Sequence, residues 1–399
     1  MPPEYTIANC PVQGGTRRFS VSIYVVRSGD NVDEIAMQYG VPVWRIIEDN
    51  QLVYPYELAV GQALLIGDGN TMGTGREIMS NGYAYPFISR WVLEQTLPYL
   101  SELSVFSYGF TTEGELVWPL LDDQWIIVMA NRFGTRPILT LTPLGADGKF
   151  DNRLITAVVW DMSGRERLIA NLLAVMEEKG YQGVDIDFEY VLEQDRDQFS
   201  EFVRVCADAM HNAGYTLSVA LAPKTSADQQ GLLYAGKDYR ALGEAADWVL
   251  LMTYEWGYTY GPPMAVAPLN KVRQVVEYAV TEILPEKISL GIPNYGYDWP
   301  LPFVRGETKA KTIGNIEAVR IAIAYGVPIQ FDEIAQSPFF YYDDGEGIRH
   351  EVWFEDVRSL QGKFDLMDEF GLRGPGYWQI MQLFRANWLL LAEQFEIRK

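Results

Sequence analysis

The sequence predicts an α/β protein in which a (β/α)8 barrel with a small α+β insertion follows a small βααβ domain. From residue 76 onward, eight short apolar runs alternate with helical stretches, a pattern typical of βα units around a parallel sheet. Residues 24–66 carry the signals of a compact unit of their own. The 399 residues exceed the roughly 250 to 300 that one core usually holds, so at least two domains are expected.

The first unit is predicted to contain a strand, two helices and a second strand, in that order, at residues 24–30, 32–39, 43–48 and 58–66. Apolar Val32, Ile35 and Ala36 mark one face of the first helix. Residues 67–75 hold four glycines without apolar periodicity and are interpreted as a linker. The predicted domains are therefore 23–67 and 76–399, after an N-terminal extension, 1–22, that has no assignment.

The barrel strands are placed at the apolar runs that follow residue 76, with helices between them. The expected strands are 77–82, 102–108, 136–142, 183–189, 216–222, 248–254, 288–293 and 374–380, and the clearest helices are 163–179, 194–212 and 270–284. The gap before the last strand is longer than one helix needs. We expect a small α+β insertion at about 299–350, with a helix at 313–325 and a hairpin at 339–354 around an Asp-Gly turn.

The fourth strand carries three carboxylates at alternate positions. Because side chains in a strand alternate between faces, Asp185, Asp187 and Glu189 should share one face. Like charges held close together raise at least one carboxyl pKa, which a general acid at neutral pH requires. The alternative is an edge strand with a solvated acidic face.

Composition excludes several classes of function. The net charge of −21 argues against nucleic acid and anionic membranes as partners. The chain has no run of 18 apolar residues, so we expect no membrane insertion. The chain has only His211 and His350, and neither Cys10 nor Cys206 has a ligand at metal spacing, so we expect free thiols, no metal and no cofactor. The 11 Trp, 24 Tyr and 18 Phe suit either sugar stacking or a large aromatic core.

The first unit resembles a LysM module. The residues that carry the resemblance are Val26, Gly29, Asp30, Ile35, Ala36, Tyr39, Gly40, Val41, Asn50, Leu58, Gly61, Gln62, Leu64 and Ile66. Such modules bind glycans that contain N-acetylglucosamine, such as peptidoglycan and chitin. The resemblance thus implies a glycan as the partner of this chain, although a module kept only for packing or targeting is the alternative.

The larger domain resembles glycoside hydrolase family 18. The Gly-Val-Asp-Ile-Asp-Phe-Glu segment at 183–189, Met-Thr-Tyr at 252–254 and a Trp near the last strand carry this resemblance. It implies that Glu189 protonates the leaving oxygen while the substrate's own acetamido group acts as the nucleophile. Asp187 would then hold the acetamido N–H, Asp185 would share a proton with Asp187, Tyr254 would orient the acetamido oxygen, and Trp378 would form the floor beneath the sugar.

Two positions depart from the family pattern. Gln182 replaces the Asp that begins the motif; we expect it on the same face as the acids, where it would shift the pH optimum modestly. Glu255 follows Tyr254 where the family often has Asp, and the longer side chain is a candidate for binding sugar hydroxyls. Further candidates for substrate binding are Trp256, Tyr85, Asn294 and Tyr295.

Within the family, the N-terminal LysM-like unit and the stretches at 81–85, 291–299 and 350–363 carry a narrower resemblance. On these features the chain looks most like the bacterial spore-cortex lytic enzymes. This resemblance implies an N-acetylglucosaminidase that acts on peptidoglycan at β-1,4 linkages during spore germination. No signal peptide is visible at 1–10, so the expected location is the spore cortex or coat, or the cytoplasm. A chitinase or chito-oligosaccharide hydrolase and a non-catalytic glycan-binding protein stay open as alternatives.

Overall fold

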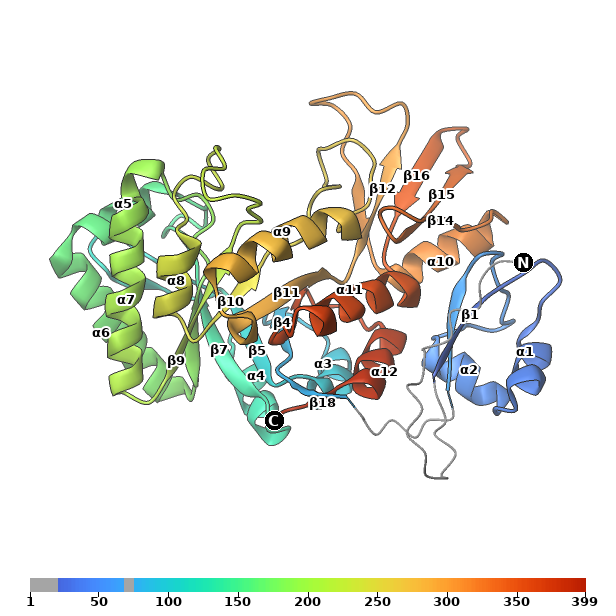
Figure 1. The fold of residues 1–399 in the computed structure, drawn as a ribbon, viewed down its shortest axis with the longest axis horizontal. Coiled ribbons are helices and arrows are strands. Elements are labelled where there is room, and N and C mark those ends of the chain that lie inside the picture. Colours follow the sequence, from blue (N-terminus) through green and yellow to red (C-terminus); the bar gives the residue numbers. More distant parts are fainter. Residues whose placement is uncertain (1–20, 68–74) are drawn as a thin grey trace.

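The computed structural model describes residues 21–67 and 75–399. Residues 1–20 of the predicted extension, Cys10 among them, and residues 68–74 of the predicted linker lie outside the described residues. Eight parallel strands close into a ring, so the predicted barrel is confirmed (Figure 1). In spatial order they are β4 (Asn81–Ala84), β5 (Glu102–Phe110), β7 (Arg136–Leu141), β8 (Gly183–Ile186), β9 (Thr216–Leu221), β10 (Trp248–Leu251), β11 (Ile288–Pro293) and β17 (Gly374–Trp378).

Helices cover the outside of the ring because the outward side chains of its strands are apolar. They are α3 (Arg90–Thr96), α4 (Gln124–Arg132), α5 (Arg153–Trp160), α6 (Met162–Lys179), α7 (Arg196–Asn212), α8 (Tyr239–Ala245), α9 (Leu269–Glu282), α11 (Val357–Glu369) and α12 (Arg385–Gln394). Local sequence sets their ends. Asp161 caps α6 by accepting from two backbone amides, and Gly180 ends it at a φ of 84°. Cys206 on α7 is a buried free thiol.

Short elements complete the barrel domain. They are η1 (Leu97–Tyr99), η2 (Glu193–Asp195), η3 (Pro285–Lys287), β3 (Glu77–Ile78), β6 (Leu116–Val117) and β18 (Glu396–Ile397). The run predicted as one strand at 77–82 is divided, because β3 pairs with β18 near the chain's end and only β4 enters the barrel. The fourth and sixth strands are shorter than predicted: β8 ends at Ile186 and β10 at Leu251, so the residues after them leave the sheet.

The insertion between β11 and β17 is an antiparallel sheet with one helix, as the sequence predicts, but its sheet begins a few residues earlier. Its elements are β12 (Gly296–Pro300), β13 (Lys311–Ile313), α10 (Asn315–Ala324), β14 (Gln330–Asp332), β15 (Ser337–Asp343) and β16 (Arg349–Trp353). The side chain of Asp344 accepts from the amides of Glu346 and Ile348, which closes the hairpin between β15 and β16.

The N-terminal unit has the predicted order, with β1 (Ser22–Val25), α1 (Val32–Tyr39), α2 (Val43–Asp49) and β2 (Ala63–Ile66). Asn31 caps α1, and the side chain of Asn50 ties the end of α2 to Leu65 in β2. The unit lies against α11 and α12 of the barrel domain and close to α10 of the insertion (Figure 1).

Candidate active site

Asp185 lies inside the barrel, fully buried in β8. Its two carboxylate oxygens accept hydrogen bonds from the Tyr83 hydroxyl at 2.8 Å and from Ser218 Oγ at 2.7 Å. Burial raises the pKa of Asp185 to about 6, although both hydrogen bonds act to lower it. Both oxygens of Asp185 are thus held by side chains of other barrel strands, β4 and β9.

Asp187 is the first residue after β8 and is 7% exposed. Its Oδ1 is buried and has no hydrogen-bond partner among residues 21–67 and 75–399. Burial, together with the nearby charges of Glu189 and Asp185, raises the pKa of Asp187 well above its ordinary range. This oxygen can therefore accept a hydrogen bond from a donor outside the described part of the chain.

Glu189 is half-buried and lines a cavity of about 190 Å³ at the carboxyl ends of the strands. The cavity is also lined by Tyr254, Glu255, Trp256, Ala222, Pro223, Leu233, Tyr234 and Met252. Burial raises the pKa of Glu189 above its ordinary value. A carboxyl in this environment keeps its proton at a higher pH than in water, as a general acid requires.

Lys237 faces the two acids, and no pattern in the sequence points to it. It is 1% exposed and donates from Nζ to the backbone carbonyl of Phe188. Its charge acts against the upward pKa shifts of Asp187 and Glu189, while its own burial lowers the pKa of Lys237 to about 8. The residue lies in a loop after β9, where no periodicity distinguishes a buried lysine from a solvated one.

Trp378 ends β17 within a group of aromatic rings. Its ring centroid lies 5.7 Å from that of Tyr83, 6.2 Å from Tyr85 and 5.1 Å from Phe106, and it is half-buried. The charge of Asp187 contributes, after burial, to a raised pKa of Tyr85, which places this predicted residue beside the acids. Phe106, in β5, is a further member that the sequence did not reveal.

Tyr254 lies three residues beyond the end of β10. The buried Thr253 holds this segment by donating to the carbonyl of Gly291 at 2.8 Å. Burial and the charges of Asp187 and Glu189 raise the pKa of Tyr254 well above its ordinary value, so its hydroxyl stays protonated and can donate.

Glu255 has a φ of 66°, a left-handed conformation that is uncommon outside glycine. Its carboxylate accepts hydrogen bonds from the hydroxyls of Tyr295 and Tyr297. Trp256 lines the same cavity, half-buried. The hydroxyl of Tyr295 is thus bound to Glu255. The side-chain amide of the buried Asn294 donates to the backbone carbonyls of Gln379 and Gln382. These two predicted residues orient their neighbours instead of presenting free polar groups to a ligand.

Gln182 does not lie on the face of the acids, and that expectation is wrong. Side chains alternate along the strand, so position 182 lies on the face of position 184 and not on that of Asp185. The Gln182 side chain is exposed and donates to Asn131 Oδ1 at 2.8 Å, next to the end of α4. It precedes the first residue of β8, at the opposite end of the strand from Glu189, so the expected shift in pH optimum loses its basis.

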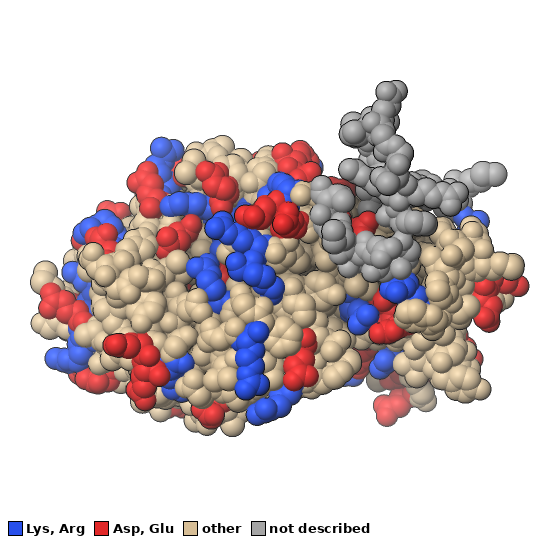
Figure 2. Space-filling model, turned by 90° about the horizontal axis from the view of Figure 1, so that it is seen from below, with Lys and Arg blue, Asp and Glu red and all other residues tan. Residues whose placement is uncertain are grey.

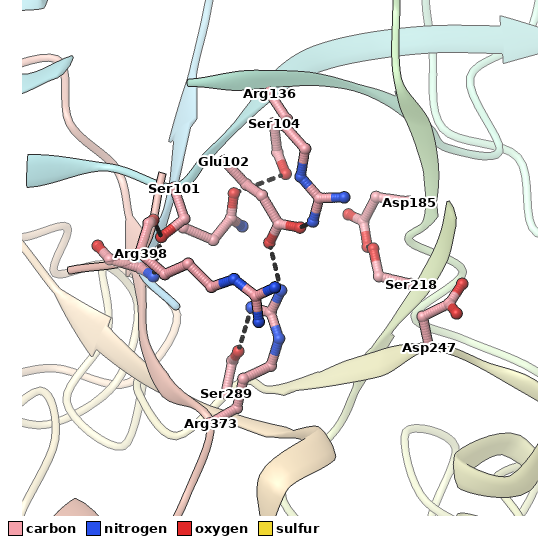
Figure 3. Close-up of polar contacts among 12 residues, drawn as sticks. Ser101, Glu102, Ser104, Arg136, Asp185, Ser218, Asp247, Ser289, Arg373 and Arg398 are labelled. Atoms are coloured by element: carbon pink, nitrogen blue, oxygen red, sulfur yellow. Dashed lines mark hydrogen bonds and ion pairs between the residues drawn. The ribbon is translucent and has the colours of Figure 1, made fainter. Parts of the chain in front are cut away.

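The barrel interior beneath Asp185 is polar (Figure 3). Glu102, fully buried in β5, pairs with Arg136 and, at 2.8 Å, with Arg373. Arg373 also donates to Ser289 Oγ at 3.4 Å. Glu102 is one cause of the raised pKa of Asp185, after burial, and its two arginine partners limit this repulsion.

The described residues contain no group of three or more side chains suited to hold a metal ion. Within the same ranges, no helix has the length and apolar character needed to cross a membrane. Acidic and basic side chains are mixed over the face shown in Figure 2, so the acidic excess does not form one continuous area there.

Comparisons with known proteins agree with this geometry. The family model "Glycosyl hydrolases family 18" matches residues 145–382, and the model "LysM domain" matches residues 24–67. The cortical fragment-lytic enzyme of Bacillus subtilis is 37% identical, with 95% of this chain and 99% of that protein covered.

Two solved structures also superpose on most of this chain. The spore cortex-lytic enzyme SleL of Bacillus cereus superposes with a TM-score of 0.90 at 35% identity, covering 96% of this chain and 99% of that chain. A chitinase from Chromobacterium violaceum superposes with a TM-score of 0.73 at 26% identity, covering 79% of this chain and 98% of the other.

Proposed function

The chain belongs to the glycosyl hydrolases of family 18, and on that premise we propose that it cleaves β-1,4 linkages after N-acetylglucosamine in spore-cortex peptidoglycan. It is a glycoside hydrolase. Its cortex substrate is supported by the similarity to a cortical fragment-lytic enzyme and a spore cortex-lytic enzyme over nearly the whole chain. On this proposal the protein acts at the spore, on the glycan that surrounds it.

The free Oδ1 of Asp187, close to Glu189, carries the proposed mechanism. Glu189 gives its proton to the leaving glycosidic oxygen, and the 2-acetamido oxygen of the substrate attacks C1 as that bond breaks. Asp187 accepts a hydrogen bond from the acetamido N–H, so the positive charge of the oxazolinium ion forms next to a carboxylate. Glu189, now ionised, takes a proton from water, which attacks C1 on the same face as the departed group. The bond from C1 to the acetamido oxygen breaks in this step, which restores the acetamido group and the original anomeric configuration.

The neighbouring residues orient the substrate in this proposal. Tyr254 donates its hydroxyl to the acetamido oxygen and fixes the angle of attack. Trp378 forms an apolar floor beneath the sugar, supported by the rings of Tyr85 and Phe106. Asp185, held by Tyr83 and Ser218, supplies a fixed negative charge below Asp187. Glu255 and Trp256 line the cavity on the side of Glu189 and are placed to contact adjoining sugars.

The N-terminal module contributes attachment. Its match to the LysM family supports binding of the N-acetylglucosamine-containing chain, while the barrel performs hydrolysis. The division at 23–67 and 76–399 is thus proposed to separate holding the polymer from cutting it.

Replacement of Glu189 by Gln tests the catalytic assignment. It removes the transferable proton with little change of shape, and hydrolysis of cortex fragments should fall by about 10²-fold or more. Glu193→Gln, at an exposed carboxylate four residues further along, is the matched control and should keep activity. Release of reducing ends at an unchanged rate from Glu189→Gln would contradict the assignment.

Hydrolysis of chitin is the second candidate function, favoured by the superposition on a chitinase. The proposed acid, acetamide acceptor and aromatic floor would serve both substrates equally. Mass spectrometry of products distinguishes them: N-acetylglucosamine at the new reducing end of cortex fragments supports the peptidoglycan assignment. Activity confined to chitin oligomers would replace it with the chitinase assignment.

A further inference from the structure

The loop at residues 222–238 joins β9 to α8 and forms one wall of the cavity at Glu189. The loop residues that line this cavity are Ala222, Pro223, Leu233 and Tyr234. Close to its end the same loop carries Lys237, the cation that faces the acids. The contacts that hold the loop therefore act on both the cavity wall and this cation.

Lys224 is a second buried lysine of the loop, and its side chain crosses from the start of the loop to the end. Its Nζ donates to the backbone carbonyl of Lys237 at 3.0 Å and to that of Ala227 at 3.0 Å. A buried ammonium group is unfavourable unless hydrogen bonds satisfy it. These bonds therefore fix the side chain of Lys224 and, with it, the backbone at Lys237.

The hydroxyl of Tyr239, the first residue of α8, ties the base of the same loop. It accepts from the Lys224 amide at 3.0 Å and donates to the Ala222 carbonyl at 2.5 Å. Tyr239 is buried, and its ring centroid lies 6.0 Å from Lys224 Nζ. The loop is thus held at its start through Ala222 and Lys224, and at its end through Lys237.

The end of the loop packs directly against the segment that carries the acids. Lys237 donates from Nζ to the Phe188 carbonyl, and this Nζ lies 4.6 Å from the centroid of the Phe199 ring. A Cβ added to Gly236 would lie 2.1 Å from the Val191 carbonyl oxygen, so the backbones of the two segments are in contact. A shift of the backbone at Lys237 would therefore move its ammonium group relative to Phe188.

The two lysines face different charged groups. Burial lowers the pKa of Lys237 to about 8, and the charges of Asp187 and Glu189 act against this change. Burial also lowers the pKa of Lys224, but the charges that act on it come from other residues: Arg196, Asp238, Asp228 and Glu282. Lys224 is therefore not in direct electrostatic contact with the acids.

Glu189 faces Lys237 on one side and uncharged or acidic groups on the others. After burial, its charge raises the pKa of four neighbours, which are Asp187, Tyr190, Tyr254 and Glu255. Among the described residues, the cation that lowers the pKa of Glu189 is Lys237. An effect of Lys224 on Glu189 is thus expected only through the position of Lys237.

We propose that Lys224 is a positioning residue for hydrolysis, because its bond to the Lys237 carbonyl fixes the Lys237 ammonium group against Phe188 and so holds Glu189 for proton transfer. Lys224 touches no reacting atom in this arrangement and acts through Lys237. The inference rests on the proposed function, which gives Glu189 the role of the acid. Tyr239 supports the same arrangement from the base of the loop.

The pH profile of Lys224→Met tests this role. The substitution removes the ammonium group and keeps most of the apolar length of the side chain. On cortex fragments, kcat/KM should fall by about tenfold or more, since the acid segment is less well fixed. A displaced Lys237 opposes the rise of the Glu189 pKa less, so the alkaline limb should move to higher pH by about half a unit or more. A wild-type pH profile in Lys224→Met, whatever its rate, would overturn the proposal.

Lys287→Met is the matched control. Lys287 lies directly before β11, at the amino end of the strand, and its ammonium group donates to the backbone carbonyls of Gly243 at 2.9 Å and Ala246 at 2.7 Å. Its loss removes the same kind of contact far from the acids, so the wild-type pH profile should be kept. An equal shift of the alkaline limb in this variant would mean that the effect is general and not due to Lys224.

The double variant Lys224→Met/Lys237→Met tests whether Lys224 acts through Lys237. Once position 237 carries no charge, a movement of its backbone can no longer change the pKa of Glu189. The alkaline limb of the double variant should therefore coincide with that of Lys237→Met alone. Additive shifts of the limb would show that Lys224 acts by another route, and the proposal would be wrong.

Hydrogen exchange at the Lys237 amide, which donates to the Tyr234 carbonyl at 3.1 Å, follows the loop without any use of activity. Exchange should be about tenfold faster or more in Lys224→Met and unchanged in Lys287→Met. Faster exchange with a wild-type pH profile would refute the positioning role and leave the catalytic assignment intact. If the wild-type chain hydrolysed no fragments, the proposed function would be contradicted, while exchange would still show whether Lys224 holds the loop.

Tyr239→Phe decides the matter if Lys224→Met does not fold. It removes only the hydroxyl that joins the Ala222 carbonyl to the Lys224 amide. We expect faster exchange at the Lys237 amide and a smaller movement of the alkaline limb in the same direction. An unchanged exchange rate together with an unchanged limb would count against the proposal as strongly as a wild-type profile in Lys224→Met.

Discussion

Lys237 donates a hydrogen bond from its ammonium group to the backbone carbonyl of Phe188, the residue between Asp187 and Glu189. One buried cation thereby holds the segment that carries both acids and opposes the rise of their pKa values. Its role in the proposed mechanism is positional, because it reaches the reacting atoms only through its neighbours.

Replacement of Lys237 by Met should change both rate and pH dependence. Loss of the charge raises the pKa of Glu189 further, so the alkaline limb of the kcat/KM profile, where the acid loses its proton, should move to higher pH. Loss of the bond to Phe188 should lower the maximal rate by about tenfold or more. Lys237→Arg, which keeps the charge, should restore the wild-type profile in part. A Lys237→Met enzyme with the wild-type profile would contradict this role.

Replacement of Tyr254 by Phe removes the proposed donor to the acetamido oxygen without emptying its site. A hydrogen bond of this kind contributes about 1.5 to 3 kcal/mol when its partner gains charge, so kcat should fall about 10- to 100-fold with a smaller change in KM. Steady-state kinetics on cortex fragments provides the measurement. Tyr258→Phe, at an exposed tyrosine four residues later, is the control, and an equal loss there would remove the specific role of Tyr254.

The raised pKa of Glu189 predicts how stability depends on pH. Burial makes the folded chain retain this proton to a higher pH than the unfolded chain, where glutamate titrates near 4.3. The unfolded state then binds fewer protons, so the free energy of unfolding falls as pH rises from about 4.3 through the folded-state pKa. Glu189→Gln should remove this part of the decline and be more stable than wild type at neutral pH. Urea unfolding of both proteins at pH 4.5 and 7.5 measures this difference. An equal change of the free energy of unfolding with pH in wild type and Glu189→Gln would contradict the prediction.

The sequence predicted the barrel because its strands and helices have different periodicities, and it predicted the three acids because they interrupt an apolar strand. Through the family resemblance the sequence also implies that Asp187 holds the acetamido N–H, and the structure adds that Oδ1 of Asp187 has no partner among the described residues. The expectation that Gln182 shares the face of the acids is wrong because residues an odd number of positions apart in a strand point to opposite faces.

Other features depend on contacts between distant parts of the chain. Lys237 and Phe188 are 49 positions apart, and no local pattern announces that a lysine in a loop will be buried. Asn294 and Tyr295 are predicted to bind substrate, but whether their polar groups face a ligand depends on partners at Gln379 and Glu255. The docking of the N-terminal module likewise depends on contacts between residues far apart in the sequence, such as those of the Ile329 amide with the Val60 carbonyl and of Arg358 with the Gly61 carbonyl.

Gly61 is where that docking should be most sensitive to substitution. Its φ is 83°, and a Cβ added there would overlap the carbonyl oxygen of Ile329 in the insertion. Gly61→Ala should therefore push the module away and break the bond from the Ile329 amide to the Val60 carbonyl. Gly40→Ala is a matched control, because Gly40 has a φ of 67° but no atom near its added Cβ.

Both alanines carry the cost of a left-handed backbone, so their difference isolates the collision at the domain junction. Hydrogen exchange at the Ile329 amide measures it: exchange should be about tenfold faster or more in Gly61→Ala, which corresponds to about 1.4 kcal/mol of lost protection, and unchanged in Gly40→Ala. Amides in α6, remote from the junction, should exchange alike in both variants. Equal protection of Ile329 in the two variants would mean that the module is not held in place by this contact.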